Sequence, residues 1–203
     1  MTASKTEAML RLWQIIDACT LCGIAEYARN KVFGDGNLNS KIVLVGEAPG
    51  MDEDKSGHPF IGLAGQILRK CLIAAGLKPK SLFIANVLKC HPPEIIDPAP
   101  SGNRKPSVKE TNNCLSFLDN QLDIIDPKIV VALGNTAGSA ILRPEVKKVE
   151  VTKMFGQSFE KGGRRVIVTY HPQYLGYRAN DPGLERDYID LFKRIKTWAK
   201  TGA

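Results

Sequence analysis

Short apolar runs alternate with helical patterns along most of the chain. Four runs rich in β-branched residues have the length and composition of buried strands. They span residues 42–45, 82–88, 128–133 and 165–170. Elsewhere apolar residues recur at a spacing of three to four, which is typical of helices that pack one face on a core. These predicted helices cover residues 6–18, 61–72, 107–125, 137–142 and 184–200.

Strands that alternate with helices favour an α/β fold class. Strands as apolar as these are buried on both faces, which is the situation in parallel sheets covered by helices. We therefore expect a three-layer α/β/α sandwich with a central, mainly parallel four-stranded sheet. No repeat or linker interrupts the pattern, so residues 1–203 are expected to form a single domain.

In such sheets the loops that leave the carboxyl ends of the strands build the binding site. Those loops begin at Glu47, after Asn86, at Gly134 and at His171. A histidine at a strand end could be structural or functional, and a buried strand-end amide offers both a donor and an acceptor. We therefore treat His171 and Asn86 as candidate site residues.

The loop after the first strand has unusual chemistry. A glycine-rich turn between a strand and a helix often binds phosphate, but this one is followed by Asp52, Glu53 and Asp54. Three carboxylates would repel a phosphate, so we expect the loop to handle something other than a free nucleotide. Phe60 is most simply a core residue, although Gly57 and Pro59 would let the loop present its ring for stacking.

Two further segments carry weaker signals. The segment 91–106 contains five prolines, so we expect an irregular loop with a functional or mobile character. Residues 143–163 are mixed and could form a small hairpin. Ser107 with Glu110 three residues later predicts a capping box at the start of a helix.

Composition and charge narrow the setting. The chain has 43% hydrophobic and 24% charged residues, which is ordinary for a globular protein. It has no apolar run of membrane-spanning length and no apolar signal core, so we expect a cytoplasmic protein. The formal net charge of +7 favours a polyanionic partner, but a generic basic surface would explain it equally well.

Five cysteines in a cytoplasmic chain indicate metal binding or catalysis before disulfides. Cys71 lies on the apolar face of a predicted helix and is expected in the core. Cys19 and Cys22 form a CxxC pair, to which Cys90 and Cys114 could add two ligands. The spacing allows a zinc ion, a [4Fe–4S] cluster, or a redox pair with two core cysteines.

Three segments carry a family resemblance: GEAPGMDEDKSGHPFIGLAG, NVLKC and TYHPQYL. Together with four cysteines in matching order, they resemble the family 4 uracil-DNA glycosylases, the iron–sulfur members of the uracil-DNA glycosylase superfamily. The similarity runs from Cys19 to the last helix. It implies that Cys19, Cys22, Cys90 and Cys114 hold a structural [4Fe–4S] cluster.

The resemblance also implies roles for the strand-end residues. Phe60 would stack on a flipped-out uracil, Asn86 would pair with its edge, and the backbone at Glu47 and Ala48 would contact its other side. His171 would donate a hydrogen bond to uracil O2. Leu175, or Tyr174 beside it, would intercalate into the gap that the base leaves in DNA.

Water activation is less directly implied. Glu47 is our first candidate for the carboxylate that orients water, and Glu53 is the second, although a solvated loop would also explain Glu53. Ala48 stands where the best-known superfamily members, with GQDPYH, have an aspartate. The loop between Cys90 and Cys114 looks long, as in X-type members that become covalently joined to the abasic sugar through a histidine. Only His91 lies near, so we expect ordinary turnover.

The sequence thus predicts a monofunctional glycosylase that removes uracil from single- or double-stranded DNA in base excision repair. We expect a monomer associated with the nucleoid, with Arg178 and Lys89 as candidate phosphate contacts and with replication or repair proteins as conceivable partners. Three alternatives stay open. They are an X-type variant that forms a covalent adduct with the abasic sugar, a non-catalytic iron–sulfur module that binds DNA, and a zinc-containing hydrolase that acts on free nucleotides.

Overall fold

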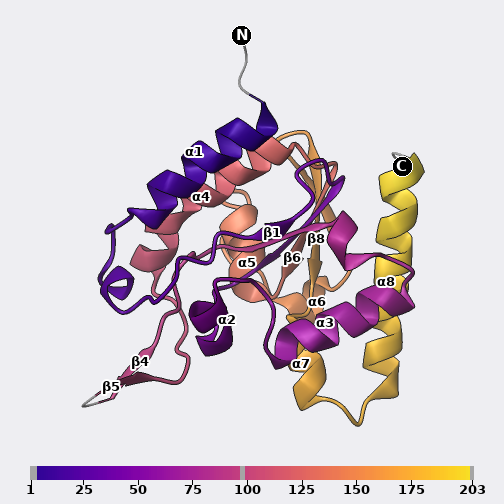
Figure 1. Cartoon of the computed structure of the whole chain (residues 1–203). Helices are drawn as coiled ribbons and strands as arrows, with labels where there is room; N and C mark the ends of the chain where they lie inside the picture. Colours follow the sequence, from indigo (N-terminus) through magenta and orange to yellow (C-terminus); the bar gives the residue numbers. More distant parts are fainter. Residues whose placement is uncertain (1–3, 97–98, 202–203) are drawn as a thin grey trace.

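A three-layer α/β architecture is present in the computed structural model, which describes residues 4–96 and 99–201 (Figure 1). One sheet of six strands lies between two groups of helices, in the order β1-β3-β2-β6-β8-β7. The strands are β1 (Asp35–Gly36), β2 (Ile42–Gly46), β3 (Phe83–Asn86), β6 (Ile129–Leu133), β7 (Ser158–Lys161) and β8 (Arg164–Thr169). The expected α/β sandwich is confirmed.

The sheet itself is larger than predicted and is mixed. Its four central strands, β3, β2, β6 and β8, run parallel, as expected. At the edges, β1 pairs antiparallel with β3, and β7 pairs antiparallel with β8, so the prediction of four strands is wrong. β1 has only two residues, both exposed, and β7 has no buried residue. Neither edge strand therefore has the apolar run by which the central strands can be recognised.

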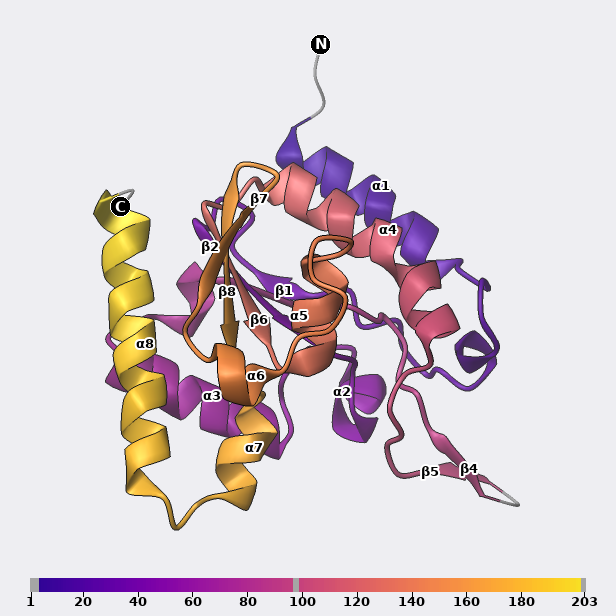
Figure 2. The same cartoon turned by 180° about the vertical axis from the view of Figure 1, so that it is seen from behind.

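Helices cover both faces of the sheet. They are α1 (Lys5–Asp17), α2 (Met51–Ser56), α3 (Leu63–Ala74), α4 (Val108–Ile125), α5 (Asn135–Ile141), α6 (Val151–Met154), α7 (Pro172–Tyr177) and α8 (Pro182–Thr201), with 3-10 turns η1 (Gly23–Glu26) and η2 (Pro79–Ser81). Alternate strand residues point to opposite faces. Val43 and Val45 pack with α1, α4 and α5, whereas Ile42 and Leu44 pack with α3, α7 and α8. Figure 2 shows these two helical layers from behind.

Local signals set several helix boundaries. The predicted capping box is confirmed, because Ser107 Oγ accepts from the Glu110 N–H and the Glu110 carboxylate accepts from the Ser107 N–H. The acidic stretch after β2 forms the short helix α2 rather than a loop, with its carboxylates in the first turn, where the helix dipole favours them. The next helix begins at Leu63, two residues later than predicted.

The proline-rich segment contains regular structure, contrary to the prediction. β4 (Glu94–Ile96) pairs antiparallel with β5 (Ala99–Ser101), and the hairpin projects from the body of the molecule (Figure 1). Prolines are tolerated in such a two-stranded ribbon because each strand has one unpaired edge. Part of the predicted loop, residues 97–98, lies outside the described residues.

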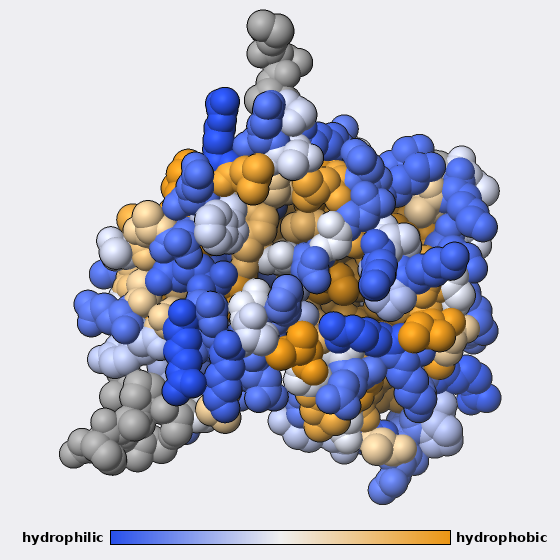
Figure 3. All heavy atoms as spheres, in the orientation of Figure 1, coloured by the Kyte–Doolittle hydropathy of each residue, from blue (hydrophilic) through white to orange (hydrophobic). Residues whose placement is uncertain are grey.

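The surface agrees with the mixed composition. Hydrophilic residues cover most of the face seen in Figure 3, and hydrophobic residues reach it in small separate groups. Within residues 4–96 and 99–201, no helix is both long enough and apolar enough to span a lipid bilayer.

Candidate active site

A cavity of about 640 Å³ opens at the carboxyl ends of the four parallel strands. Its lining includes Glu47 after β2, Asn86 at the end of β3, Gly134 after β6 and His171 after β8. The chain leaves β2 toward β3 on one side, whereas β6 lies on the other, so the cavity lies at the switch point of the sheet. The four predicted loops are therefore brought together.

Asn86 and Phe60 form the floor of the cavity, and Gly46 lies against both of them. Gly46 and Asn86 are register partners in β2 and β3. A Cβ atom at Gly46 would lie 2.4 Å from Asn86 Oδ1 and 2.5 Å from Phe60 Cζ, so only glycine fits. Asn86 is 2% exposed, and its Oδ1 has no hydrogen-bond partner among the described residues. A buried acceptor of this kind is costly unless a ligand donates to it.

Lys89 lies behind this floor rather than on the surface. Its side chain is 1% exposed, and its Nζ donates to the Asn86 carbonyl at 2.8 Å and to Gln121 Oε1 at 2.6 Å. Burial lowers the pKa of Lys89 to about 7, and the neighbouring Cys114 opposes that shift. The prediction that Lys89 contacts a DNA phosphate is therefore wrong, since the ammonium group holds the end of β3 in place.

Phe60 has a strained backbone at the cavity wall. Its φ of 54° is in the left-handed region, which is unfavourable for a bulky residue and is found mainly where the surroundings enforce it. The Arg69 guanidinium donates to the Phe60 carbonyl. The Phe60 ring lines the cavity, and its centroid lies 6.1 Å from that of the His171 ring.

Glu53 fixes the same loop through three backbone hydrogen bonds. Its Oε1 accepts from the Ile61 and Gly62 N–H groups, both at 2.8 Å, and its Oε2 accepts from the Gly50 N–H at 3.0 Å. Glu47 differs, because its half-buried carboxylate lines the cavity and has no hydrogen-bond partner within the described parts of the chain. Of the two candidate carboxylates, only Glu47 is free to act on a ligand or water.

His171 is a neutral donor held at the amino end of α7. Its Nδ1 accepts from the Gln173 N–H at 3.2 Å, which places the ring proton on Nε2. Burial lowers the pKa of His171 to about 4, although Glu53 partly opposes the shift. At neutral pH the cavity therefore contains an uncharged imidazole with one N–H to donate.

The four cysteines of the predicted ligand set all belong to the side of the sheet covered by α1 and α4, where Cys90 and Cys114 are in the core and Cys19 and Cys22 pack against it. Cys19 follows α1, Cys22 precedes η1, Cys90 follows β3, and Cys114 is in α4. Burial raises the pKa of Cys90 to about 12, and the other three thiols add to this rise, so the four groups lie within electrostatic range. Cys71 is in the core, as predicted.

The spacing of these thiols limits which metal centre they could bind. Among the described residues, no three Cys, His, Asp or Glu side chains are close enough together to bind one metal ion. The cubane of a [4Fe–4S] cluster binds each thiolate through a different iron, so it needs a wider set of sulfurs than a zinc ion does. The assignment of these four cysteines to a [4Fe–4S] cluster therefore stays a prediction.

The two residues predicted to intercalate, Leu175 and Tyr174, do not line the cavity, whereas their neighbour Tyr177 does. Leu175 is 6% exposed and packs in the core, and Tyr174 is half-buried, stacked on Tyr170 with a centroid distance of 4.9 Å. Tyr177 is the aromatic residue that reaches solvent there, 78% exposed. Sequence reasoning missed Tyr177, because no local pattern distinguishes it from its neighbours.

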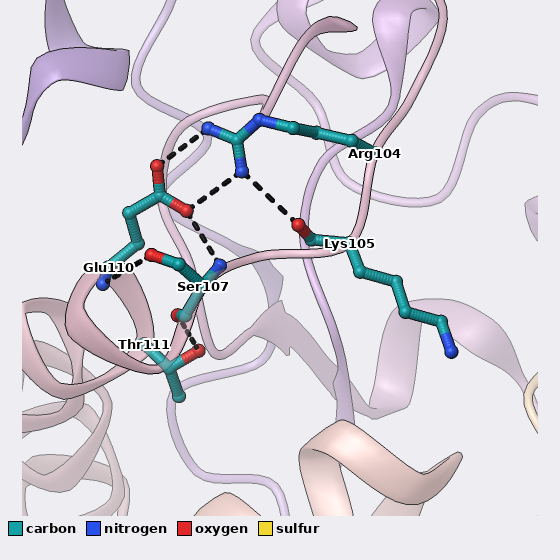
Figure 4. A network of polar contacts seen from close by, with 5 residues as sticks. All are labelled: Arg104, Lys105, Ser107, Glu110 and Thr111. Atoms are coloured by element: carbon teal, nitrogen blue, oxygen red, sulfur yellow. Dashed lines mark hydrogen bonds and ion pairs between the residues drawn. The ribbon is translucent and has the colours of Figure 1, made fainter.

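A polar network orders another part of the rim (Figure 4). Arg104 donates to both carboxylate oxygens of Glu110, at 2.6 and 2.9 Å, and its hydrogen bonds lower the pKa of Glu110 to about 2. The Lys105 side chain extends away from this pair and lines the cavity. Its ammonium group is therefore available to an anionic ligand.

Comparison with known proteins gives the family of this chain. Residues 33–194 match the model of the Uracil DNA glycosylase superfamily, so the chain belongs to this superfamily. It is 38% identical over 198 residues to the Type-4 uracil-DNA glycosylase of Thermotoga maritima, covering 97% of each chain.

Other relatives are of the same kind. The Type-4 uracil-DNA glycosylase of Archaeoglobus fulgidus is 37% identical over 89% of this chain and 87% of its own length. A Type-5 uracil-DNA glycosylase of Pyrobaculum aerophilum is 32% identical, but only over 69% of this chain and 64% of its own length. The similarity to Type-4 proteins thus extends over more of the chain.

Proposed function

We propose that the protein is a monofunctional DNA glycosylase. It hydrolyses the N-glycosidic bond of deoxyuridine in DNA, releases uracil and leaves an abasic site for base excision repair. The observation that carries this proposal is the buried, unpaired Asn86 Oδ1 on the floor of a cavity between Phe60 and His171. Membership of the superfamily supports the same activity.

Uracil recognition follows from the floor of the cavity. The N3–H of uracil would donate to Asn86 Oδ1, which satisfies the buried acceptor. The Phe60 ring would stack on the base, and the backbone at Glu47 and Ala48 would contact its opposite side. A base must leave the DNA stack to reach such a cavity, so the enzyme binds an extruded nucleotide.

Bond cleavage uses two further groups. As the C1′–N1 bond breaks, its electrons pass to uracil, and the neutral His171 donates its Nε2–H to the developing charge on O2. Glu47 orients the water whose oxygen bonds to C1′, and it accepts the proton that this water loses. Glu53 acts as a positioning residue, because both of its oxygens already accept backbone N–H groups.

Cys19, Cys22, Cys90 and Cys114 would hold a [4Fe–4S] cluster with a structural role. Four thiols from α1, η1, the end of β3 and α4 would be linked, which ties the helical layer to the strand that ends in Asn86. Buried thiols with raised pKa values, such as those of Cys90 and Cys114, need a cationic partner before they ionise, and the iron of a cluster would supply it.

Ordinary turnover is favoured over a covalent adduct with the abasic sugar. The His91 ring is nearly buried, and its Nε2 contacts the Gly102 carbonyl at 2.9 Å and Asn103 Oδ1 at 2.7 Å. A nitrogen in such contacts is not free to attack the sugar. The other histidine outside the active site, His58, is on the exposed surface.

The DNA backbone would follow the basic residues of the rim. Lys105 lines the cavity, and Arg178 lies just beyond α7. Either cation would neutralise a phosphate beside the extruded nucleotide. We expect the protein to associate with the nucleoid, where such a substrate lies, and to act as a monomer with residues 1–203 as one domain.

The test is the release of uracil from a labelled oligonucleotide, with an alkali-labile site as the product. Thymine and cytosine in the same position are the controls, and both should be left intact. A non-catalytic binder would retain the oligonucleotide without releasing the base, and its affinity would not respond to His171→Ala. A shifted protein–DNA band that survives denaturation would indicate the covalent variant instead.

A further inference from the structure

The end of helix α7 presents one exposed aromatic ring beside the cavity. Tyr177 is the last residue of α7 and is 78% exposed, the largest fraction among the large hydrophobic and aromatic residues that the structure describes. His171 precedes the same helix, so about 9 Å along the helix axis separates the two residues. Both line the cavity.

The other large side chains of this helix already have packing partners within the protein. Leu175 packs in the core with α3 and α8. Tyr174 is the middle of a stack, because Tyr170 lies against one face and the Arg178 guanidinium lies 5.7 Å from its ring centroid. For Tyr177, in contrast, no ring contact or side-chain hydrogen bond is found within residues 4–96 and 99–201.

The helix that carries Tyr177 is firmly held. At Gly176 an added Cβ would lie 3.0 Å from Ile67 Cδ1, which shows how closely α7 approaches α3. Phe155 and Tyr170 extend the aromatic stack beneath Tyr174, with centroids 4.8 Å apart. A ring on such a base can be pushed against another molecule without moving the helix.

We propose that Tyr177 is the residue that enters the DNA base stack and fills the space left by the extruded nucleotide. This inference rests on the proposed glycosylase function. The tyrosine ring has the flat face that neighbouring bases stack on, and it loses little conformational freedom when it does so. Arg178, held over Tyr174, lies at the next position and would contact the adjacent phosphate.

The test measures the single-turnover rate of uracil release by Tyr177→Ala and by the wild type. Both proteins are given the same uracil-containing strand, once as a single strand and once in a duplex. In duplex DNA the variant should release uracil roughly 5- to 150-fold more slowly, which is the range for loss of one base–aromatic stack. On the single strand, where little stacking is broken, the loss should stay within about threefold. Tyr177→Phe, which keeps the ring, should behave like the wild type.

Two controls make the result specific. Trp13→Ala removes an exposed aromatic residue from α1, outside the cavity lining, and should leave both rates unchanged. In the second control, a bulky polycyclic residue opposite uracil in the duplex fills the space that the extruded base leaves. This duplex should restore the rate of uracil release by Tyr177→Ala. Equal losses on both strands, or no rescue, would overturn the inference. A wild type that releases no uracil from either substrate would instead refute the proposed function.

Discussion

The turn after β2 and the loop around α2 are neighbours in the sequence but use their polar groups differently. In the loop, Glu53 satisfies three backbone N–H groups and Arg69 satisfies the Phe60 carbonyl. On the cavity floor, Asn86 Oδ1 and the Glu47 carboxylate have no hydrogen-bond partner among the described residues. The hydrogen bonds of the loop hold the strained Phe60 in place, whereas the polar groups on the cavity floor are available to bind a ligand. Glu47 and Glu53, six residues apart, thus differ in whether their carboxylates are already used by the fold.

Glu47→Gln should have the largest effect on catalysis. If Glu47 orients the attacking water, as proposed, loss of its carboxylate should lower kcat about 10²- to 10⁴-fold, in the range for general base catalysis. Since Glu47 supports no other group, the free energy of unfolding should change by less than about 0.5 kcal/mol. Single-turnover uracil release and denaturant unfolding measure the two quantities. Near-normal release would show that water is activated elsewhere.

The pH dependence of stability tests the burial of His171. Its pKa is about 4 in the folded protein and 6.5 when unperturbed, so the unfolded state takes up the proton first. This contribution, about 3 kcal/mol, should be fully present above pH 6.5 and disappear as the pH falls toward 4. Denaturant unfolding of the wild type and of His171→Gln across this range measures it. The prediction fails if the difference between the two proteins does not change with pH.

Gly46→Ala tests the floor on which the two regions meet. The added methyl group would overlap Asn86 Oδ1 and the Phe60 ring, and a displacement of about 1 Å at a reacting centre costs about 10²-fold in rate. Gly23→Ala is the matched control, because a Cβ there meets nothing within 4 Å. A Gly46→Ala enzyme with a normal rate would mean that the floor does not contact the base.

Glu53→Gln should reduce stability more than catalysis, which is the opposite of the effect expected for Glu47→Gln. Replacing a carboxylate that accepts three N–H groups should lower the free energy of unfolding by about 2 kcal/mol. The rate should fall less than in Glu47→Gln, with most of the change in KM, because Phe60 loses its fixed position. Steady-state kinetics on both variants measure this split. If Glu53→Gln is stable but loses kcat, then Glu53 takes part in the chemistry.

The sequence predicted the parts of the molecule that local patterns encode. The central strands have continuous apolar runs, and the sites at their carboxyl ends, Asn86 and His171, follow from the topology of a parallel sheet. Tertiary contacts decided the rest. From the sequence, Lys89 is expected on the surface, but in the fold α4 covers it and Gln121 accepts a hydrogen bond from it. Glu53 is likewise expected in solvent, but in the fold it accepts hydrogen bonds from the backbone of the following loop.

Exposure at the rim is likewise not encoded locally. Leu175, Tyr174 and Tyr177 all lie on one short helix, and only its packing against α3 and Tyr170 determines which of them reaches solvent. The edge strands β1 and β7 were missed for a related reason, since pairing with a neighbour rather than apolar composition makes them strands.

The proposed function rests on the claim that the buried Asn86 Oδ1 accepts the N3–H of uracil. The most direct measurement is the ratio of single-turnover release rates for deoxyuridine and N3-methyldeoxyuridine in the same single-stranded oligonucleotide. A site built to accept this hydrogen bond should reject the methylated base by about 10⁴-fold, because the buried acceptor stays unpaired. Comparable rates for the two bases would contradict the claim.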